Sequence, residues 1–162
     1  MAELAIAADL SARGYRIAIP YGEDSDYDLI VERDGMLERV QVKYVESDGR
    51  VVQAQCYSNS LTNGKVIRKK HYTARTIDWL AIFDATTRRC FYVPASELGE
   101  GRTSISLRLV PTANNQRIGI RDARNYEGFT PRIMALPQVE MNMEPAGLEP
   151  APSALQGRRS SN

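Results

Sequence analysis

Hydrophobic and polar residues alternate through residues 26–43, on both sides of an Asp34-Gly35 step. An Asp-Gly pair between two such runs is the strongest short signal for a β-hairpin, because glycine accepts the positive φ that a type I′ turn requires. The pattern therefore predicts two antiparallel strands joined by a two-residue turn, with Arg33 opposite Met36. We expect this hairpin to form the middle of a larger sheet.

The predicted register places Asp28 opposite Gln41, and Asp26 opposite Lys43. Because successive side chains of a strand point to opposite faces, it also divides the hairpin into two faces. One face is apolar and is expected to pack on the core, and it comprises Tyr27, Leu29, Val31, Val40 and Val42. The other face brings Asp28, Gln41 and Lys43 together. A solvated hairpin face is the alternative, since mixed polar faces are common on half-buried sheets.

The remaining pattern predicts an α/β fold. Residues 2–13 are rich in helix formers, with Gly14 as the stop signal. The apolar stripe of this helix is predicted to comprise Leu4, Ala7, Ala8 and Ser11. Strands are predicted over residues 15–20, 50–57, 77–84, 88–93 and 103–109, with 77–84 as a central buried strand and 50–57 beside the strand that carries Lys43. Short helices are predicted over residues 94–98 and 121–126.

The chain length and composition suit one domain with a hydrophobic core, since 43% of the 162 residues are hydrophobic. We expect the domain over residues 1–129 and a disordered tail over residues 130–162, where Pro, Met, Ala and Gly are scattered without periodicity. No apolar run reaches the roughly 20 residues that span a bilayer, and no charged-then-apolar leader opens the chain. These features predict a cytoplasmic protein, without a membrane partner.

The two cysteines, Cys56 and Cys90, lie far apart and have no CxxC partner, and the chain has one histidine. A zinc site of the usual ligand spacing is therefore excluded, and both cysteines are expected to be small core residues.

Basic residues are concentrated in two stretches, although the net charge is only +1. Residues 50–77 contain six Lys or Arg and no acid, and residues 101–121 contain four Arg and no acid. Local charge of this kind favours contact with the phosphates of DNA, and amide side chains suit base edges. A solvated loop and a turn segment are the alternative interpretations. The candidate DNA-binding residues are Ser58, Asn59, Ser60, Asn63, Lys65, Arg68, Lys69, Lys70, His71, Asn114, Asn115, Gln116, Arg117 and Arg121.

The polar face of the hairpin has the groups that metal-assisted hydrolysis needs. A carboxylate and an amide oxygen can hold a divalent cation, while a lysine steadies an attacking water or the charge on a phosphate. Glu3 lies in the first turn of the predicted helix, where a favourable interaction with the helix dipole is the alternative role. Asp24 and Asp26 are further candidate ligands, or satisfied loop carboxylates.

Asp28, the Gln41-Val42-Lys43 run in the next strand and Glu3 on an N-terminal helix together resemble the PD-(D/E)XK nuclease superfamily. More narrowly, residues 2–127 are similar to the group I intron-associated homing endonucleases of bacteria. The matching segments are Ala2-Glu3-Leu4-Ala5, Arg13-Gly14-Tyr15, Tyr27-Asp28-Leu29, Val40-Gln41-Val42-Lys43, Ile77-Asp78, Ser106-Leu107-Arg108-Leu109, Asn114-Asn115-Gln116 and Gly119-Ile120-Arg121. The general superfamily has an acid at the position of Gln41 and a proline at that of Tyr27; the intron-associated group itself resembles this QxK variant.

The resemblance implies a mixed central sheet flanked by helices and a sequence-specific DNA endonuclease that uses Mg²⁺ or Mn²⁺. It implies that Glu3, Asp28, Gln41 and the Val42 carbonyl hold the ion, while Lys43 orients the attacking water and helps to deprotonate it. Since cutting both strands of double-stranded DNA needs two sites, a homodimer or homotetramer is expected. The alternatives are a DNA repair or Holliday-junction nuclease of the same fold, and a catalytically inactive DNA-binding protein.

Overall fold

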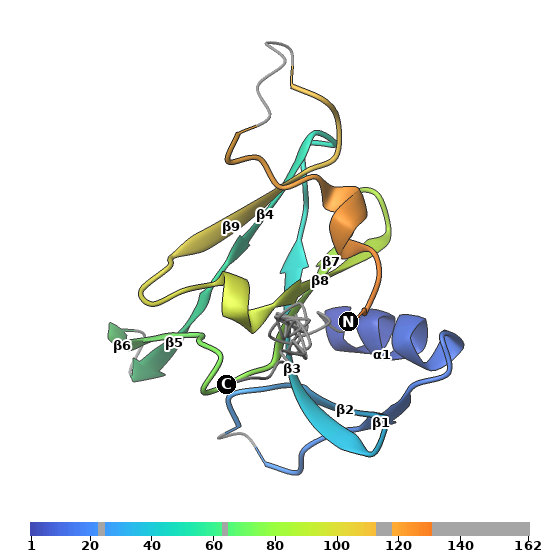
Figure 1. The fold of residues 1–162 in the computed structure, drawn as a ribbon. Coiled ribbons are helices and arrows are strands. Elements are labelled where there is room, and N and C mark those ends of the chain that lie inside the picture. Colours follow the sequence, from blue (N-terminus) through green and yellow to red (C-terminus); the bar gives the residue numbers. More distant parts are fainter. Residues whose placement is uncertain (23–24, 63–64, 113–117, 131–162) are drawn as a thin grey trace, which may run out of the picture. The chain divides into compact units, whose positions relative to one another are not determined.

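A five-stranded mixed sheet forms the centre of the fold in the computed structural model (Figure 1). Its strands are β1 (Arg16–Ala18), β2 (Leu29–Arg33), β3 (Met36–Val45), β7 (Trp79–Asp84) and β8 (Arg89–Pro94), in the order β1-β2-β3-β7-β8. Strands β3 and β7 are parallel, and the other neighbours are antiparallel. The structure describes residues 1–22, 25–62, 65–112 and 118–130, with only the backbone described where these ranges fall within residues 60–68. Most of the predicted tail lies outside these ranges.

The predicted hairpin of β2 and β3 is confirmed. Arg33 pairs with Met36, and Leu29 pairs with Val40. Asp34 and Gly35 have φ angles of 51° and 75°, the two positive values that a type I′ turn requires. The turn therefore sets the register of the strands that carry Gln41 and Lys43.

Helix α1 (Ala2–Ala12) covers one face of the sheet, called here the α1 face. Its buried residues are Ala2, Ile6 and Leu10, which pack with Val40, Val42, Trp79 and Tyr92. The predicted stripe is therefore wrong, since Leu4 is 68% exposed and Ala8 and Ser11 are also exposed. Eight of the 11 residues of this helix are apolar, so polarity alone does not mark its inner side, and the larger Ile6 and Leu10 fill the core.

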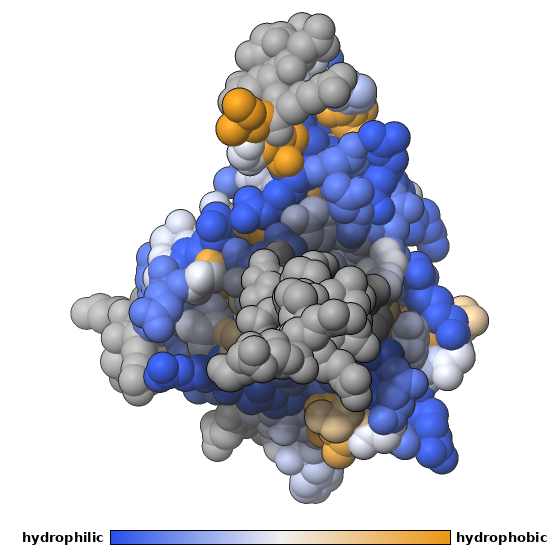
Figure 2. All heavy atoms as spheres, in the orientation of Figure 1, coloured by the Kyte–Doolittle hydropathy of each residue, from blue (hydrophilic) through white to orange (hydrophobic). Residues whose placement is uncertain are grey.

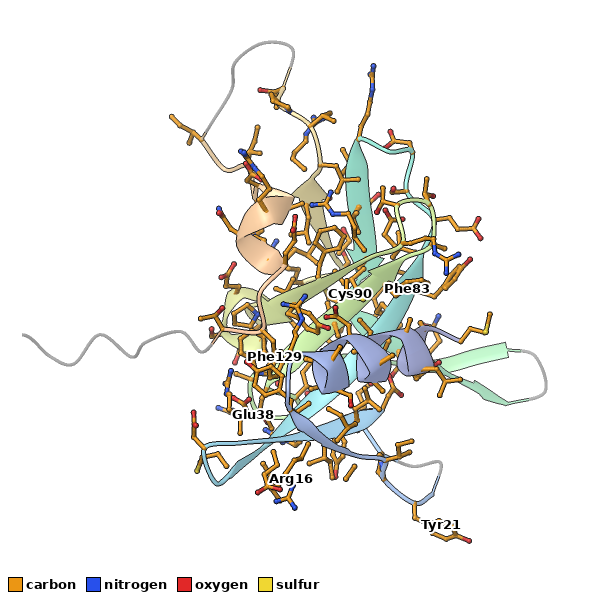
Figure 3. All side chains as sticks on the ribbon, turned by 90° about the vertical axis from the view of Figure 1, so that its right-hand side faces the viewer. Arg16, Tyr21, Glu38, Phe83, Cys90 and Phe129 are labelled. Carbon is orange, nitrogen blue, oxygen red and sulfur yellow. The ribbon has the colours of Figure 1, made fainter. Side chains whose placement is uncertain are left out.

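Phe129 closes the α1 face from the other end of the described chain (Figure 3). Its ring lies 4.6 Å from that of Trp79 and 5.3 Å from that of Tyr92, measured between centroids. Its carbonyl oxygen accepts hydrogen bonds from Tyr15 and Arg33. Residues near both ends of the predicted domain thus share one core cluster.

The opposite face of the sheet is covered by a second, two-stranded sheet of β4 (Val51–Gln55) and β9 (Ser104–Arg108), and is called here the β4–β9 face. Residues from both sheets form one buried cluster, which includes Val52, Ala54, Leu80, Ile82, Phe91, Val93, Ile105 and Leu107. The prediction that residues 50–57 lie beside the strand of Lys43 is wrong. Strand β7 takes that place, because β4 pairs with β9, some 50 residues away in the sequence.

Strands β5 (Tyr57–Thr62) and β6 (Lys65–His71) form a two-stranded ribbon, which extends away from the central sheet (Figures 1 and 3). The Asn63-Gly64 step, a pair typical of tight turns, lies outside the described residues. The predicted short helices are present as 3₁₀ turns, η1 (Ala95–Glu97) and η2 (Ala123–Tyr126). Within the described ranges, no helix combines the length and the apolar character that a membrane span requires.

Asp84 ends β7 and fixes the loop that follows β3. Its carboxylate accepts hydrogen bonds from the backbone N–H and hydroxyl of Ser47, at 3.0 and 2.8 Å, and from the Thr87 hydroxyl at 2.6 Å and the Thr86 N–H at 3.3 Å. Asp84 is 0% exposed. Burial acts to raise the pKa of Asp84, but these donors outweigh it and hold the pKa below its ordinary value.

Candidate active site

Asp28 stands at a bend directly before β2, next to the middle of β3. Its backbone N–H donates to the Val40 carbonyl at 2.9 Å, which continues the hairpin ladder. Its Oδ2 atom accepts two hydrogen bonds from β3, from the Val42 N–H at 2.7 Å and from the Gln41 Nε2 at 2.5 Å. The carboxylate is thereby tied to the strand that carries the rest of the motif.

The amide of Gln41 lies between two oxygen atoms. Its Nε2 donates to Asp28 and also to the Val42 carbonyl, at 3.3 Å. The side chain is almost fully buried, with 9% of the residue exposed. A carboxylate oxygen and a carbonyl oxygen therefore converge on one positively polarised group. A cation in this place would require the amide to turn, so that its oxygen replaces its nitrogen.

Lys43 lies on the same face of β3 as Gln41. In the parallel ladder, Gln41 pairs with Leu80 and Lys43 pairs with Ile82, and both partners belong to the core cluster of the β4–β9 face. The positive charge of Lys43 acts to lower the pKa of Asp28, and its Nζ lies 4.9 Å from the centroid of the Tyr72 ring. Asp28, Gln41 and Lys43 are therefore on one side of the sheet, where Gln41 is buried and Asp28 and Lys43 are partly exposed.

The face prediction is wrong for two residues that precede Asp28. Tyr27 packs against the core cluster of the β4–β9 face instead of sharing a face with Leu29. Asp26 forms an ion pair with Lys70 and does not pair with Lys43 in the ladder. Strand β2 begins only at Leu29, and the chain bends before it, so regular alternation does not extend to these positions.

Glu3 lines the same pocket as Asp28, although α1 packs on the other face of the sheet. This pocket has a volume of about 390 Å³ and is bordered by the first turns of α1 and by the segment between β1 and β2. The Glu3 carboxylate is about half exposed and accepts a hydrogen bond from the Met1 amine at 3.0 Å. The helix backbone N–H of Glu3 and this amine hold the pKa of Glu3 below its ordinary value.

The pKa of Asp28 is raised above its ordinary value. Burial is the main cause, and the negative charge of Glu3 adds to it. The Val42 N–H, the charge of Lys43 and the Gln41 amide act in the opposite direction but do not cancel the increase. The ionised carboxylate of Asp28 is thus short of compensating positive charge, which a bound cation would supply.

The donor atoms at this site fit a hard divalent cation. The carboxylates of Glu3 and Asp28, the Val42 carbonyl and a turned Gln41 amide offer oxygen ligands only, and such sets suit Mg²⁺ and Mn²⁺. In the described ranges, no three His, Cys, Asp or Glu side chains come together as a metal site. Any ion here would therefore be held by two acids and neutral oxygen atoms.

Cys56 and Cys90 form no disulfide bond. Both are free, and burial raises the pKa of each thiol, that of Cys90 to about 11. They are core residues, as the sequence predicts.

The β5–β6 ribbon carries most of the described part of the predicted DNA-binding set. Ser58 pairs with Lys70 and Asn59 pairs with Lys69, and both lysines are exposed. Lys69 lies over the ring of Tyr57, with its Nζ 4.8 Å from the centroid, and His71 contacts the Arg102 carbonyl at 3.1 Å. On the face shown in Figure 2, hydrophilic residues dominate the described surface.

The other predicted DNA-binding residues divide into three groups. For Ser60, Lys65 and Arg68 only the strand backbone is described, and it places Ser60 opposite Arg68. Arg121 forms an ion pair with Glu97 at 3.5 Å. Asn63, Asn114, Asn115, Gln116 and Arg117 lie outside the described residues.

Two features near the site were not predicted from the sequence. The sequence predicts a basic segment where the ribbon lies, although an Asn-Gly step between polar and β-branched residues is also a hairpin signal. The contact between Lys43 and Tyr72 had no local signal, because 29 positions separate the two residues.

Comparison with known proteins identifies a matching family and a similar solved structure. The sequence pattern of a family described as PD-(D/E)XK endonuclease matches residues 1–129. Among solved structures, that of a bacterial homing endonuclease, I-Ssp6803I, is similar with a TM-score of 0.59 and 23% sequence identity, over 77% of this chain and 82% of that one. No curated protein matches the sequence. The superfamily resemblance and the fold inferred from the sequence are confirmed by these findings.

Proposed function

Because the chain belongs to the PD-(D/E)XK endonuclease family, we propose that it is a sequence-specific endonuclease that hydrolyses phosphodiester bonds of double-stranded DNA with Mg²⁺ or Mn²⁺. One observation carries this proposal. Asp28 is hydrogen-bonded to Gln41 and Val42 on β3, and Lys43 lies on the same face of β3 as Gln41, two residues later in the strand. A carboxylate, an amide and an ammonium group thus lie on one side of the sheet, and groups of these types can serve metal-assisted hydrolysis.

The side chains have distinct roles in this proposal. Glu3, Asp28, Gln41 and the Val42 carbonyl hold the ion, and the Val42 N–H fixes the orientation of the Asp28 carboxylate. When bound, the ion offsets the negative charge of the phosphate and favours ionisation of water. Lys43 donates a hydrogen bond to the attacking water or to a phosphate oxygen, so that the water is aligned with the phosphorus.

The β5–β6 ribbon is proposed to contact the DNA. A two-stranded ribbon fits the major groove, and Lys69 and Lys70 are exposed on it. Ser58, Asn59 and His71 are the other candidates on the ribbon whose side chains the structure describes. DNA contact is also predicted for the remaining candidates, which are Ser60, Asn63, Lys65, Arg68, Asn114, Asn115, Gln116, Arg117 and Arg121.

The biological role is proposed from the similarity to a homing endonuclease. We place the protein in the bacterial cytoplasm, acting on the nucleoid, where it cuts an allele that lacks the group I intron. A homodimer or homotetramer would supply the two sites that a double-strand cut needs.

A second function is favoured by one observation. Gln41 stands where the general superfamily has an acid, and its amide nitrogen, not its oxygen, faces Asp28. A protein that binds one DNA sequence but no longer cuts it would carry the same ribbon and the same fold.

A genomic digest tests the proposal. The full-length protein is incubated with bacterial genomic DNA and Mg²⁺, and the new ends are sequenced; one recurring site is the expected result. Lys43→Ala is expected to lower the cleavage rate by roughly 100-fold or more while DNA affinity changes little. Arg16→Ala, which removes an exposed cation from β1, is the matched control and should cut normally.

Three other results would change the conclusion. Cleavage of branched DNA irrespective of sequence would identify a repair or junction nuclease. Specific binding without a metal-dependent product would identify a DNA-binding protein without activity. Cutting by Lys43→Ala at the wild-type rate would exclude the role assigned to Lys43.

A further inference from the structure

The ammonium group of Lys43 lies over the face of an aromatic ring. Its Nζ is 4.9 Å from the centroid of Tyr72, within the range of about 6 Å in which a cation is attracted to the negative face of a ring. In the part of the chain that the structure describes, no carboxylate forms an ion pair with Lys43. The ring is therefore the direct contact that restrains the end of this flexible side chain.

Tyr72 is held in place by contacts that do not involve Lys43. It is 3% exposed and belongs to the core cluster of the β4–β9 face. Its backbone N–H donates to the Cys56 carbonyl at 2.9 Å, and the Cys56 N–H donates to the Thr103 carbonyl at 2.9 Å. The ring is thus fixed where the ribbon joins the body of the protein.

We propose that Tyr72 is a positioning residue for Lys43, and this inference rests on the proposed nuclease function. The ring face attracts the ammonium and limits its positions to the side of β3 that carries Asp28 and Gln41. Lysine has a long side chain with four rotatable bonds, so without such a contact its charge would be spread over many positions. Tyr72 does not itself touch the reacting atoms.

The position of Tyr72 in the chain links this contact to DNA binding. Tyr72 directly follows His71, the last residue of β6, and Lys69 and Lys70 lie on the same strand. The ribbon proposed to contact DNA is therefore continuous in the chain with the residue that contacts Lys43.

A series of ring substitutions tests the proposal. Tyr72 is replaced by phenylalanine and then by phenylalanines with one, two and three fluorine atoms, which weaken the negative face of the ring at nearly constant shape. Single-turnover cleavage of the identified DNA site is measured at saturating protein. Phenylalanine should keep the rate within about twofold, and the rate should fall stepwise with each fluorine, to a total loss of about 5- to 30-fold. DNA affinity and melting temperature should stay constant.

Two controls separate electrostatic positioning from packing. Tyr72→Leu keeps an apolar side chain but removes the ring, and its rate should fall as far as that of the trifluorinated protein. Phe83 lies on β7 near the ring of Tyr44, and among the described contacts no cation lies over it. The same fluorination at Phe83 should leave the rate unchanged.

The results distinguish the inference from the proposed function. If the wild-type protein cuts and the fluorine series is flat, or follows the melting temperature, Tyr72 is not a positioning residue. If the wild-type protein does not cut any DNA, the nuclease function is wrong, and the inference falls with it.

Discussion

Asp28 lies directly before strand β2 of the central sheet, and Asp84 is the last residue of its strand β7. The surroundings of these two carboxyl groups shift their pKa values in opposite directions. Asp84 is fully buried and accepts four hydrogen bonds from Ser47, Thr86 and Thr87, which hold its pKa below the ordinary value. Asp28 accepts two, lies near Glu3 and has a raised pKa. A carboxylate that supports the fold is saturated with donors. One that is left short of positive charge is available to a ligand.

Cleavage should show the largest difference between the two aspartates. Asp28→Asn removes the negative charge that holds the ion, and should lower the single-turnover rate by roughly 1,000-fold. Asp84→Asn, compared at equal concentrations of folded protein, should stay within about threefold of wild type, because Asp84 binds only loop residues. A comparable loss in both variants would show that the two sites are coupled.

Stability should depend more strongly on Asp84 than on Asp28. Asp84→Ala leaves the N–H groups of Ser47 and Thr86 and two hydroxyls without an acceptor, and should lower the free energy of unfolding by roughly 2–4 kcal/mol. Asp28→Asn keeps an oxygen for the Val42 N–H and should cost less than about 1 kcal/mol. Urea denaturation without metal measures both. Equal losses would remove the distinction between the two carboxylates.

The pH dependence of the free energy of unfolding provides a further test of the difference between Asp84 and Asp28. The folded pKa of Asp84 lies below the value of 3.8 for an ordinary aspartate, so its contribution is complete above that value and is lost as the pH falls through the folded pKa. The difference in the free energy of unfolding between wild type and Asp84→Ala should therefore become smaller in acid. For Asp28 the pH dependence of stability has the opposite sign. Its raised pKa favours the protonated carboxyl in the folded state, so its contribution to folding is present in acid and is lost as the pH rises through the folded pKa.

Adding an acid at position 41 should make the Asp28 site bind Mg²⁺ more tightly, with a smaller effect than the substitutions above. Gln41→Glu places a second carboxylate against Asp28, which should tighten Mg²⁺ binding by roughly tenfold and destabilise the metal-free protein. Calorimetric titration with Mg²⁺ measures the first effect. Glu32, exposed on the same hairpin, provides the control as Glu32→Gln, which should leave Mg²⁺ affinity unchanged. An unchanged affinity in Gln41→Glu would exclude this side chain as a ligand.

Local rules in the sequence were sufficient for the hairpin. The Asp34-Gly35 step determines the turn, the turn determines the register, and the register brings Asp28 next to Gln41. The central buried strand and the end of α1 at Gly14 were also predicted from short patterns. The roles assigned to the site residues stay predictions, because no contact in the structure tests them.

Non-local pairing could not be predicted in the same way. Strand β4 could pair with any strand of suitable polarity, and only the folded chain shows that it pairs with β9. The bend before β2 turned Tyr27 to the other face, because alternation holds only inside a regular strand. The support of Lys43 by Tyr72 depends on the same long-range arrangement.

The parallel pairing of β3 with β7 has a consequence during synthesis. Residues 40–45 of β3 leave the ribosome well before their partners at residues 79–84, and until then one edge of β3 has no neighbour. A chain that stops early would contain Gln41 and Lys43 but would lack the strand that holds them in a sheet. A translation product that ends before residue 79 would therefore lack a neighbouring strand on one side of Gln41 and Lys43.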